Sequence, residues 1–114
     1  MLIPADPKAG FLAHEAEIRE AIDRVLLSGH YILGNEVESF EREFSAYQDG
    51  GHTITVANGT EALEIALRAL GVGAGDVVAT VGNTVTATVS AIEQTGAKPL
   101  FVEIDRATMT MSAD

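Results

Sequence analysis

Apolar residues in the first half of the chain recur at the spacing of an amphipathic helix. Between residues 14 and 28 they fall at i, i+4, i+7 and i+8, which is one helical face: Ile18, Ile22, Val25 and Leu26. After a glycine-containing link at residues 30–35, a second series keeps the same period: Val37, Phe40, Phe44 and Tyr47. We therefore predict two helices, the second ending at Asp49-Gly50-Gly51, with apolar faces in a core and acidic faces in solvent.

Beyond residue 52 the pattern changes to short β-branched runs that alternate with helices. Strands are predicted at residues 53–57 (TITVA), 76–81 (DVVATV) and 99–104 (PLFVEI). Helices are predicted from about residue 60 to Gly71 and from residue 84 to Gly96, since a glycine commonly ends a helix. Strand, helix, strand, helix and strand with short connections indicate two right-handed crossovers and a parallel sheet. The predicted fold class is therefore α/β, a parallel-strand β-α-β-α-β unit preceded by two helices.

The pattern also predicts how the chain is organised. Residues 1–50 form an N-terminal helical segment, and residues 51–114 begin an α/β domain. A parallel sheet of three strands cannot bury both of its faces and both of its edges with so few helices. We therefore expect a single incomplete domain, the N-terminal portion of a larger protein.

Composition narrows the possible functions. The chain has 114 residues, a formal charge of −10 and no cysteine. Such an acidic protein has no cationic surface for nucleic acid or an anionic membrane, and without cysteine it has no disulfide or thiolate zinc site. The three histidines lack metal-ligand spacing, so no metal is predicted. The N-terminus resembles no signal peptide, and no apolar run approaches the roughly 18 residues of a spanning helix, so a cytoplasmic location is expected.

The junction at residues 57–61 (ANGTE) carries the strongest chemical signal. Glycine allows a ligand to approach the backbone, first-turn N–H groups lack intrahelical acceptors, and the helix dipole favours an anion. The Thr60 hydroxyl adds a donor, so Asn58, Gly59 and Thr60 are candidates to hold a phosphate. The same residues also fit an interpretation without a ligand, in which Asn58 caps the helix and Glu61 completes a capping-box-like pair.

A second strand-to-helix junction is predicted at residues 81–85 (VGNTV). Two such junctions at neighbouring strand ends form the crevice in which open α/β sheets bind ligands. The alternative is an ordinary loop in which Asn83 or Thr84 caps the following helix. The glycines of residues 71–76 (GVGAGD) do not make a dinucleotide motif, because they follow a helix and precede a strand.

Four segments occur in the order and spacing of a known family. They are FLAHEAEI from residue 11, SGHYILGNEVESFEREFSAY from residue 28, VANGTEALEIALRALGVGAGD from residue 56 and NTVTATVSAIEQTGAKPLFVEID from residue 83. Together they resemble the N-terminal part of the DegT/DnrJ/EryC1/StrS aminotransferases, fold-type-I enzymes that use pyridoxal phosphate and mostly aminate nucleotide-linked keto sugars. The resemblance implies the start of the large cofactor-binding domain, glutamate or glutamine as amino donor, and a homodimer.

The resemblance also implies roles for individual residues. In the family, the segment matching Asn58-Gly59-Thr60 binds the cofactor phosphate through backbone N–H groups and the threonine hydroxyl. An aromatic residue usually stacks on the pyridine ring at the position of Val85, where valine offers only apolar contact, and Asn83 is a neighbouring contact. The loop matching residues 29–34 lies near the substrate pocket, which makes Tyr31 a substrate-side candidate. Asp105 matches an acid that ends a strand, and we expect its role to be structural.

No catalytic residue is predicted within this chain. Amino transfer needs a lysine that forms a Schiff base and an acid that holds the pyridine nitrogen protonated. Family members carry both well beyond the length of this chain, and Lys8 and Lys98 match neither position. The first interpretation is therefore a fragment of an aminotransferase. The two alternative interpretations are a non-catalytic remnant or interaction module of the same fold, and an unrelated small phosphate-binding α/β module.

Overall fold

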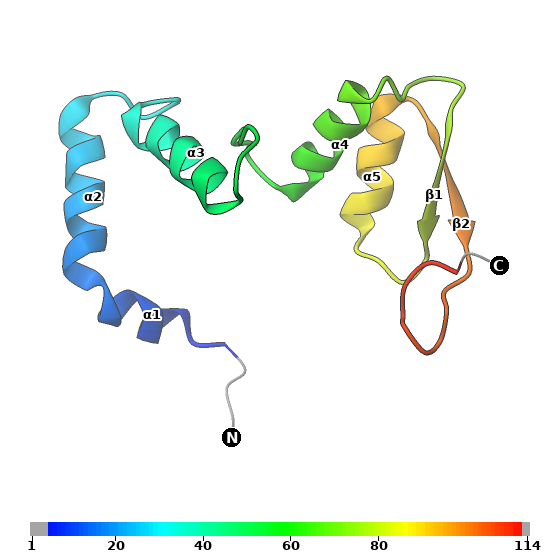
Figure 1. Cartoon of the computed structure of the whole chain (residues 1–114), viewed down its shortest axis with the longest axis horizontal. Helices are drawn as coiled ribbons and strands as arrows, with labels where there is room; N and C mark the ends of the chain where they lie inside the picture. The colour runs from blue at the N-terminus through cyan, green and yellow to red at the C-terminus, as the bar shows by residue number, and fades with distance from the viewer. Residues whose placement is uncertain (1–4, 113–114) are drawn as a thin grey trace. The chain divides into compact units, whose positions relative to one another are not determined.

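A computed structural model describes residues 5–112, and the chain divides into two compact units that meet in sequence between Thr55 and Val56 (Figure 1). The first unit contains helices α1 (Pro7–Ala13), α2 (Glu15–Ser28) and α3 (Asn35–Tyr47). The second contains α4 (Gly59–Ala69), β1 (Val77–Val81), α5 (Thr86–Thr95) and β2 (Lys98–Val102). No helix in residues 5–112 is long and apolar enough to cross a membrane.

Helix α1 was not predicted from the hydrophobic pattern. It begins at Pro7, and the carboxylate of Asp6 accepts a hydrogen bond of 3.1 Å from the Ala9 N–H. Proline is favoured in the first helical turn, where its missing N–H costs nothing, and aspartate is a favoured cap. The signal was therefore an Asp-Pro pair, and the helix is too short for periodicity to show it.

Helices α2 and α3 confirm the two predicted helices and their ends. Gly29 follows α2 in the left-handed region at φ 70°, and Asp49, Gly50 and Gly51 all have positive φ after α3. The predicted burial of their apolar stripes was wrong for the described chain, in which neither helix has a buried residue. Phe40 and Phe44 stack at 5.5 Å between ring centroids and are 52% and 39% exposed.

The second unit confirms the α/β class. Strands β1 and β2 pair in parallel, from Val77 opposite Lys98 to Val81 opposite Val102, and α5 is the crossover between them. Helix α4 lies beside α5, which also contacts both strands (Figure 1). Ile92 on α5 is the largest of the buried apolar residues in residues 5–112 and is 2% exposed. The core of this unit is therefore the face of α5 that packs against α4 and the sheet.

The strand predicted at residues 53–57 is not formed in the described chain. A β-strand requires a hydrogen-bonded ladder with a neighbouring strand, and this segment has none in residues 5–112. The N–H groups of Thr53 and Thr55 instead donate to side chains of α3. The sheet accordingly has two strands and one crossover, rather than three strands and two crossovers.

The last predicted strand ends earlier than expected, at Val102. The chain then turns back on itself, so that Ile104 forms an antiparallel bridge with Met111. Asp105 holds this turn, because its Oδ1 accepts hydrogen bonds from the N–H groups of Thr108 at 2.9 Å and Ala107 at 2.7 Å. These two donors stabilise the ionised carboxylate and lower the pKa of Asp105. The contacts support the structural role expected for this acid.

Candidate functional site

Helix α4 begins with a reciprocal pair of side-chain caps. The Oδ1 atom of Asn58 accepts a hydrogen bond of 3.0 Å from the Glu61 N–H, and the Glu61 Oε2 atom accepts one of 2.8 Å from the Ala57 N–H. This arrangement confirms the capping pair predicted from the sequence. It leaves the side-chain oxygen of Asn58 directed at the helix backbone, so any contribution of Asn58 to a ligand comes from elsewhere in the residue.

Three polar donors at the start of α4 remain for a ligand. Gly59 and Thr60 occupy the first two helical positions, whose N–H groups have no acceptor four residues earlier within the helix. Neither these N–H groups nor the Thr60 hydroxyl has a hydrogen-bond partner in residues 5–112. A Cβ built on Gly59 would meet no heavy atom within 4 Å. The space beside this turn is therefore open and is not filled by packed side chains.

The chemistry of these donors fits a phosphoryl group. Two backbone N–H groups and a hydroxyl can each donate a hydrogen bond to an anion, and the helix dipole adds partial positive charge. The first turn of α4 carries one charged side chain, the carboxylate of Glu61, and its Oε2 atom is occupied by the Ala57 N–H. A full positive charge is absent from this turn, so further neutralisation of a phosphate must come from outside it.

The junction before α5 differs from the one that was predicted. Val85 is the N-cap residue, and no side chain caps the helix, so the expected cap by Asn83 or Thr84 was wrong. The hydroxyl of Thr84 lies 2.9 Å from that of Thr88, which directs it along the helix. Val85 itself is 67% exposed, which leaves its apolar side chain available for contact with a ligand.

Asn83 lies in a hollow at the carboxyl ends of the two strands. The hollow has a volume of about 270 Å³ and is lined by Gly82, Asn83 and the residues that end and follow β2: Phe101, Val102, Glu103 and Ile104. Open α/β sheets bind ligands at this end of their strands. Sequence reasoning found Gly82 and Asn83 but missed Glu103, although a polar residue directly after a strand was the available signal.

The two junctions lie at the same end of the second unit. Helices α4 and α5 both begin at the end toward which the arrows of β1 and β2 point (Figure 1). The structure thereby brings the first turn of α4, the Asn83 loop and Val85 to one end of a single compact unit. This is the arrangement expected of a crevice built from successive strand-to-helix junctions.

Tyr31 belongs to the first unit, in the connection between α2 and α3. Its ring is 66% exposed, and its hydroxyl donates a hydrogen bond of 3.2 Å to the Leu26 carbonyl oxygen. Gly34 follows closely, and a Cβ at that position would lie 3.0 Å from the His30 carbonyl oxygen. The turn is therefore tightly closed and presents Tyr31 outward, while its role toward a substrate stays a prediction.

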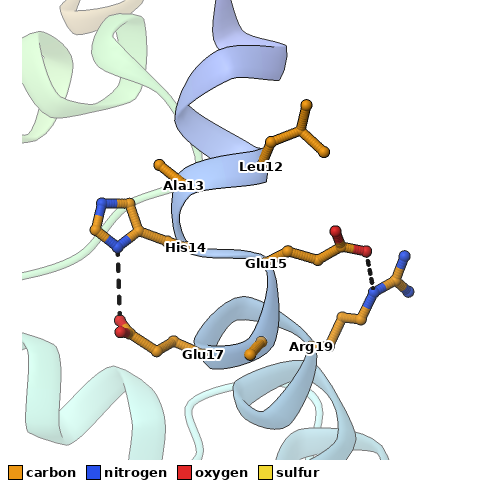
Figure 2. A pocket seen from close by; sticks show the side chains of 7 residues that line it. Leu12, Ala13, His14, Glu15, Glu17 and Arg19 are labelled. Carbon is orange, nitrogen blue, oxygen red and sulfur yellow. Dashed lines mark hydrogen bonds and ion pairs between the residues drawn. The ribbon is translucent and has the colours of Figure 1, made fainter.

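The pocket at the junction of α1 and α2 is a surface feature. Figure 2 shows it lined by residues around His14, with a volume of about 520 Å³. His14 Nδ1 lies 3.7 Å from a Glu17 oxygen, and Arg19 Nε lies 2.8 Å from a Glu15 oxygen. Both pairs are local contacts at the start of α2 between exposed side chains.

Neither lysine is placed as a reacting group. Lys98 is exposed at the first position of β2, at the opposite end of the sheet from the candidate crevice, and Lys8 is exposed on α1. Residues 5–112 also contain no group of three His, Cys, Asp or Glu side chains that could hold a metal ion.

Comparison with known proteins identifies what the chain is similar to. The model of the DegT/DnrJ/EryC1/StrS aminotransferase family matches residues 13–114. A dTDP-3-amino-3,4,6-trideoxy-alpha-D-glucose transaminase from Micromonospora megalomicea is 43% identical over 99 residues, which is 87% of this chain and 26% of that protein. The chain therefore spans about a quarter of this relative.

Solved structures show the same likeness. A DegT/DnrJ/EryC1/StrS aminotransferase from Brucella abortus matches 98% of this chain with a TM-score of 0.90 and 35% identity, over 30% of its own length. NtdA from Bacillus subtilis, solved with bound cofactor PMP, matches 82% of this chain with a TM-score of 0.77 and 32% identity, over 21% of its own length.

Proposed function

Because the chain belongs to the DegT/DnrJ/EryC1/StrS aminotransferase family, we propose that it is the N-terminal part of an aminotransferase that uses pyridoxal phosphate. The proposed reaction transfers an amino group from glutamate or glutamine to a keto sugar linked to a nucleotide. The observation that carries the proposal is the open first turn of α4, whose three free donors lie within the region that the family model matches. The name of the Micromonospora relative, a dTDP-sugar transaminase, supports the substrate class.

In this proposal the first turn of α4 binds the phosphate of the cofactor. The N–H groups of Gly59 and Thr60 and the Thr60 hydroxyl would donate to phosphate oxygens, while Asn58 and Glu61 keep the turn in helical geometry. Val85 would contact the ring through its apolar side chain, and Asn83 would contribute a polar contact from the neighbouring loop. When bound, pyridoxal phosphate supplies an electron sink for the chemistry at the amino-bearing carbon.

The cap at Asn58 makes a prediction for the isolated chain. Asn58→Ala removes the acceptor of the Glu61 N–H and should lower the free energy of unfolding by about 1 kcal/mol. Urea unfolding followed by circular dichroism would measure this loss. Asn83→Ala is the matched control, because Asn83 precedes a helix whose cap has no side-chain hydrogen bond. Equal losses in the two variants would contradict the capping role.

The 114-residue chain by itself is expected to show no transaminase turnover. Lys98 begins β2 at the end of the sheet opposite the candidate crevice, and neither Lys8 nor Lys98 matches the Schiff-base position of the family. An assay that follows 2-oxoglutarate formation from glutamate in the presence of a dTDP-linked keto sugar would test this. Turnover that disappears in Lys8→Ala or Lys98→Ala would overturn the expectation.

The DNA that encodes the chain offers a direct check on the proposed size of the enzyme. An open frame past the codon for Asp114, with a lysine in the later region, would provide the group that the reaction requires. Protein expressed from that longer frame should bind pyridoxal phosphate and turn over. A stop codon directly after Asp114 would favour a non-catalytic remnant of the fold.

Partners and location belong to the same proposal. We expect the whole enzyme to be a cytoplasmic homodimer that binds neither nucleic acid nor membrane, and Tyr31 to lie on the substrate side of its active site. The net charge of −10 supports the absence of polyanionic partners. Sedimentation of the whole enzyme would test the dimer.

A second candidate function is a phosphate-binding α/β module unrelated to amino transfer. The open donors at α4 favour it as well, since they would accept any phosphoryl group. Affinities for pyridoxal phosphate, pyridoxal and inorganic phosphate separate the two candidates. A cofactor site prefers pyridoxal phosphate over both fragments, whereas a general phosphate module binds inorganic phosphate about as well.

A further inference from the structure

Two side chains of α3 hold the extended segment that follows this helix. Glu41 Oε1 accepts hydrogen bonds from both the N–H and the hydroxyl of Thr55, each at 2.8 Å. Ser45 Oγ accepts a hydrogen bond of 3.0 Å from the Thr53 N–H, and the two hydroxyls lie 2.8 Å apart. We propose that Glu41 and Ser45 form a clasp that sets the register of residues 53–55 along α3.

The spacing of a helix and that of an extended chain match at this clasp. Residues four apart in an α-helix are separated by about 6 Å along its axis. Residues two apart in an extended chain are separated by about 6.6 Å. Glu41 and Ser45 are therefore spaced to meet Thr55 and Thr53, with the segment running antiparallel to the helix. A shift of the segment by one residue along α3 would place Ile54 at a polar contact and break the hydrogen bonds of both Thr53 and Thr55.

The clasp occupies the backbone donors on one edge of the extended segment. Its N–H groups at positions 53 and 55 are satisfied by helix side chains, so this edge cannot pair with another strand. Ile54, between these two positions, is 75% exposed and is not part of the clasp. Thr55 lies three residues before Asn58 in the chain, so the clasp fixes backbone close to the start of α4 in sequence.

The charge on Glu41 contributes to the clasp. The Thr55 N–H and hydroxyl stabilise the ionised carboxylate and lower the pKa of Glu41 below its ordinary value of 4.5. Glu38, Arg42 and Glu43 are the charged residues of α3 within three positions of Glu41, and the titratable His52 directly precedes the clasped segment. None of them makes an ion pair with Glu41 in the described chain. The contribution of the ionised Glu41 carboxylate to the stability of the clasp is complete above pH 4.5 and is lost as the pH falls through the lowered pKa.

Amide hydrogen exchange of the 114-residue chain, resolved by NMR, tests the clasp. At neutral pH the Thr53 and Thr55 amides should exchange about tenfold more slowly than that of Ile54, because only they donate to α3. Glu41→Ala should bring the Thr55 amide to the rate of Ile54, and Ser45→Ala should do the same for Thr53. The matched control is Glu43→Ala, which removes an exposed carboxylate from the same helix and should leave all three rates unchanged.

A measurement on the unaltered chain guards against variants that fail to fold. The Thr55 amide proton should shift as the pH is lowered, with a midpoint below 4.5, because it donates to the carboxylate that titrates. In Glu41→Gln, which keeps the side-chain length and an acceptor oxygen, this shift should vanish. A Thr55 amide that exchanges as fast as Ile54, or that shows no titration, would overturn the clasp. These measurements need no cofactor, so their outcome does not depend on whether the proposed function is correct.

Discussion

Thr60→Ala in the whole enzyme should weaken the binding of pyridoxal phosphate by about tenfold to hundredfold, as expected for the loss of one hydrogen bond to a charged group. The hydroxyl has no partner in residues 5–112, so its loss should affect the ligand more than the fold. The two backbone donors of the first turn remain in the variant, which is why binding is reduced and not abolished. Titration of the apoenzyme with cofactor, followed by absorbance, measures the change.

Two controls make this result specific to the phosphate. Pyridoxal lacks the phosphate, so its affinity should be the same in the wild type and in Thr60→Ala. Thr108→Ala removes a threonine hydroxyl from the turn held by Asp105 and should leave cofactor affinity unchanged. Equal weakening of pyridoxal and pyridoxal phosphate would show that Thr60 acts on the fold and would remove the phosphate role.

Ile92→Ala is expected to lower the free energy of unfolding of the second unit by about 3 kcal/mol, within the range of about 2–5 kcal/mol found for such truncations. Ile92 is 2% exposed and is the largest of the buried apolar residues of the described chain, which otherwise are Ala91 and Ala97. Its removal leaves a cavity where α5 packs against α4 and the sheet. With so few buried apolar groups, the rest of the core has little to offset the loss.

Urea unfolding of the 114-residue chain and of the variant would measure the effect. Leu70→Ala, at the end of α4, is the matched control because Leu70 is 81% exposed and should contribute little. A loss for Ile92→Ala no larger than that for Leu70→Ala would mean that α5 does not form the core of this unit.

For α4 and for the end of α5, which depend on neighbours in sequence, the prediction agrees with the structure. The helix predicted near residue 60 begins at Gly59, and the one predicted to end at Gly96 is followed there by a left-handed glycine at φ 91°. The Asn58 and Glu61 pair also forms as expected, since both partners lie within one helical turn. Hydrogen bonds over three or four residues are encoded by local spacing, which one sequence displays directly.

The candidate site was predictable in part for the same reason. The open donors of Gly59 and Thr60 follow from the general geometry of a helix start. The hollow beside Asn83 does not follow from local geometry, because it is lined by Glu103 and other residues about twenty positions later in the chain. Only the parallel pairing of β1 with β2 brings those two stretches together.

The sequence alone determined helices α2 to α5, the cap of α4, the α/β class and the family, because periodicity, capping chemistry and ordered motifs are properties of the chain itself. Tertiary structure alone decided that Glu41 and Ser45 hold residues 53–55, and that residues 53–57 form no strand within residues 5–112. It also decided that Ile92 is buried, whereas no residue of α2 or α3 is buried in residues 5–112. Strand pairing and burial depend on which distant surface supplies a partner, and local sequence does not specify that surface.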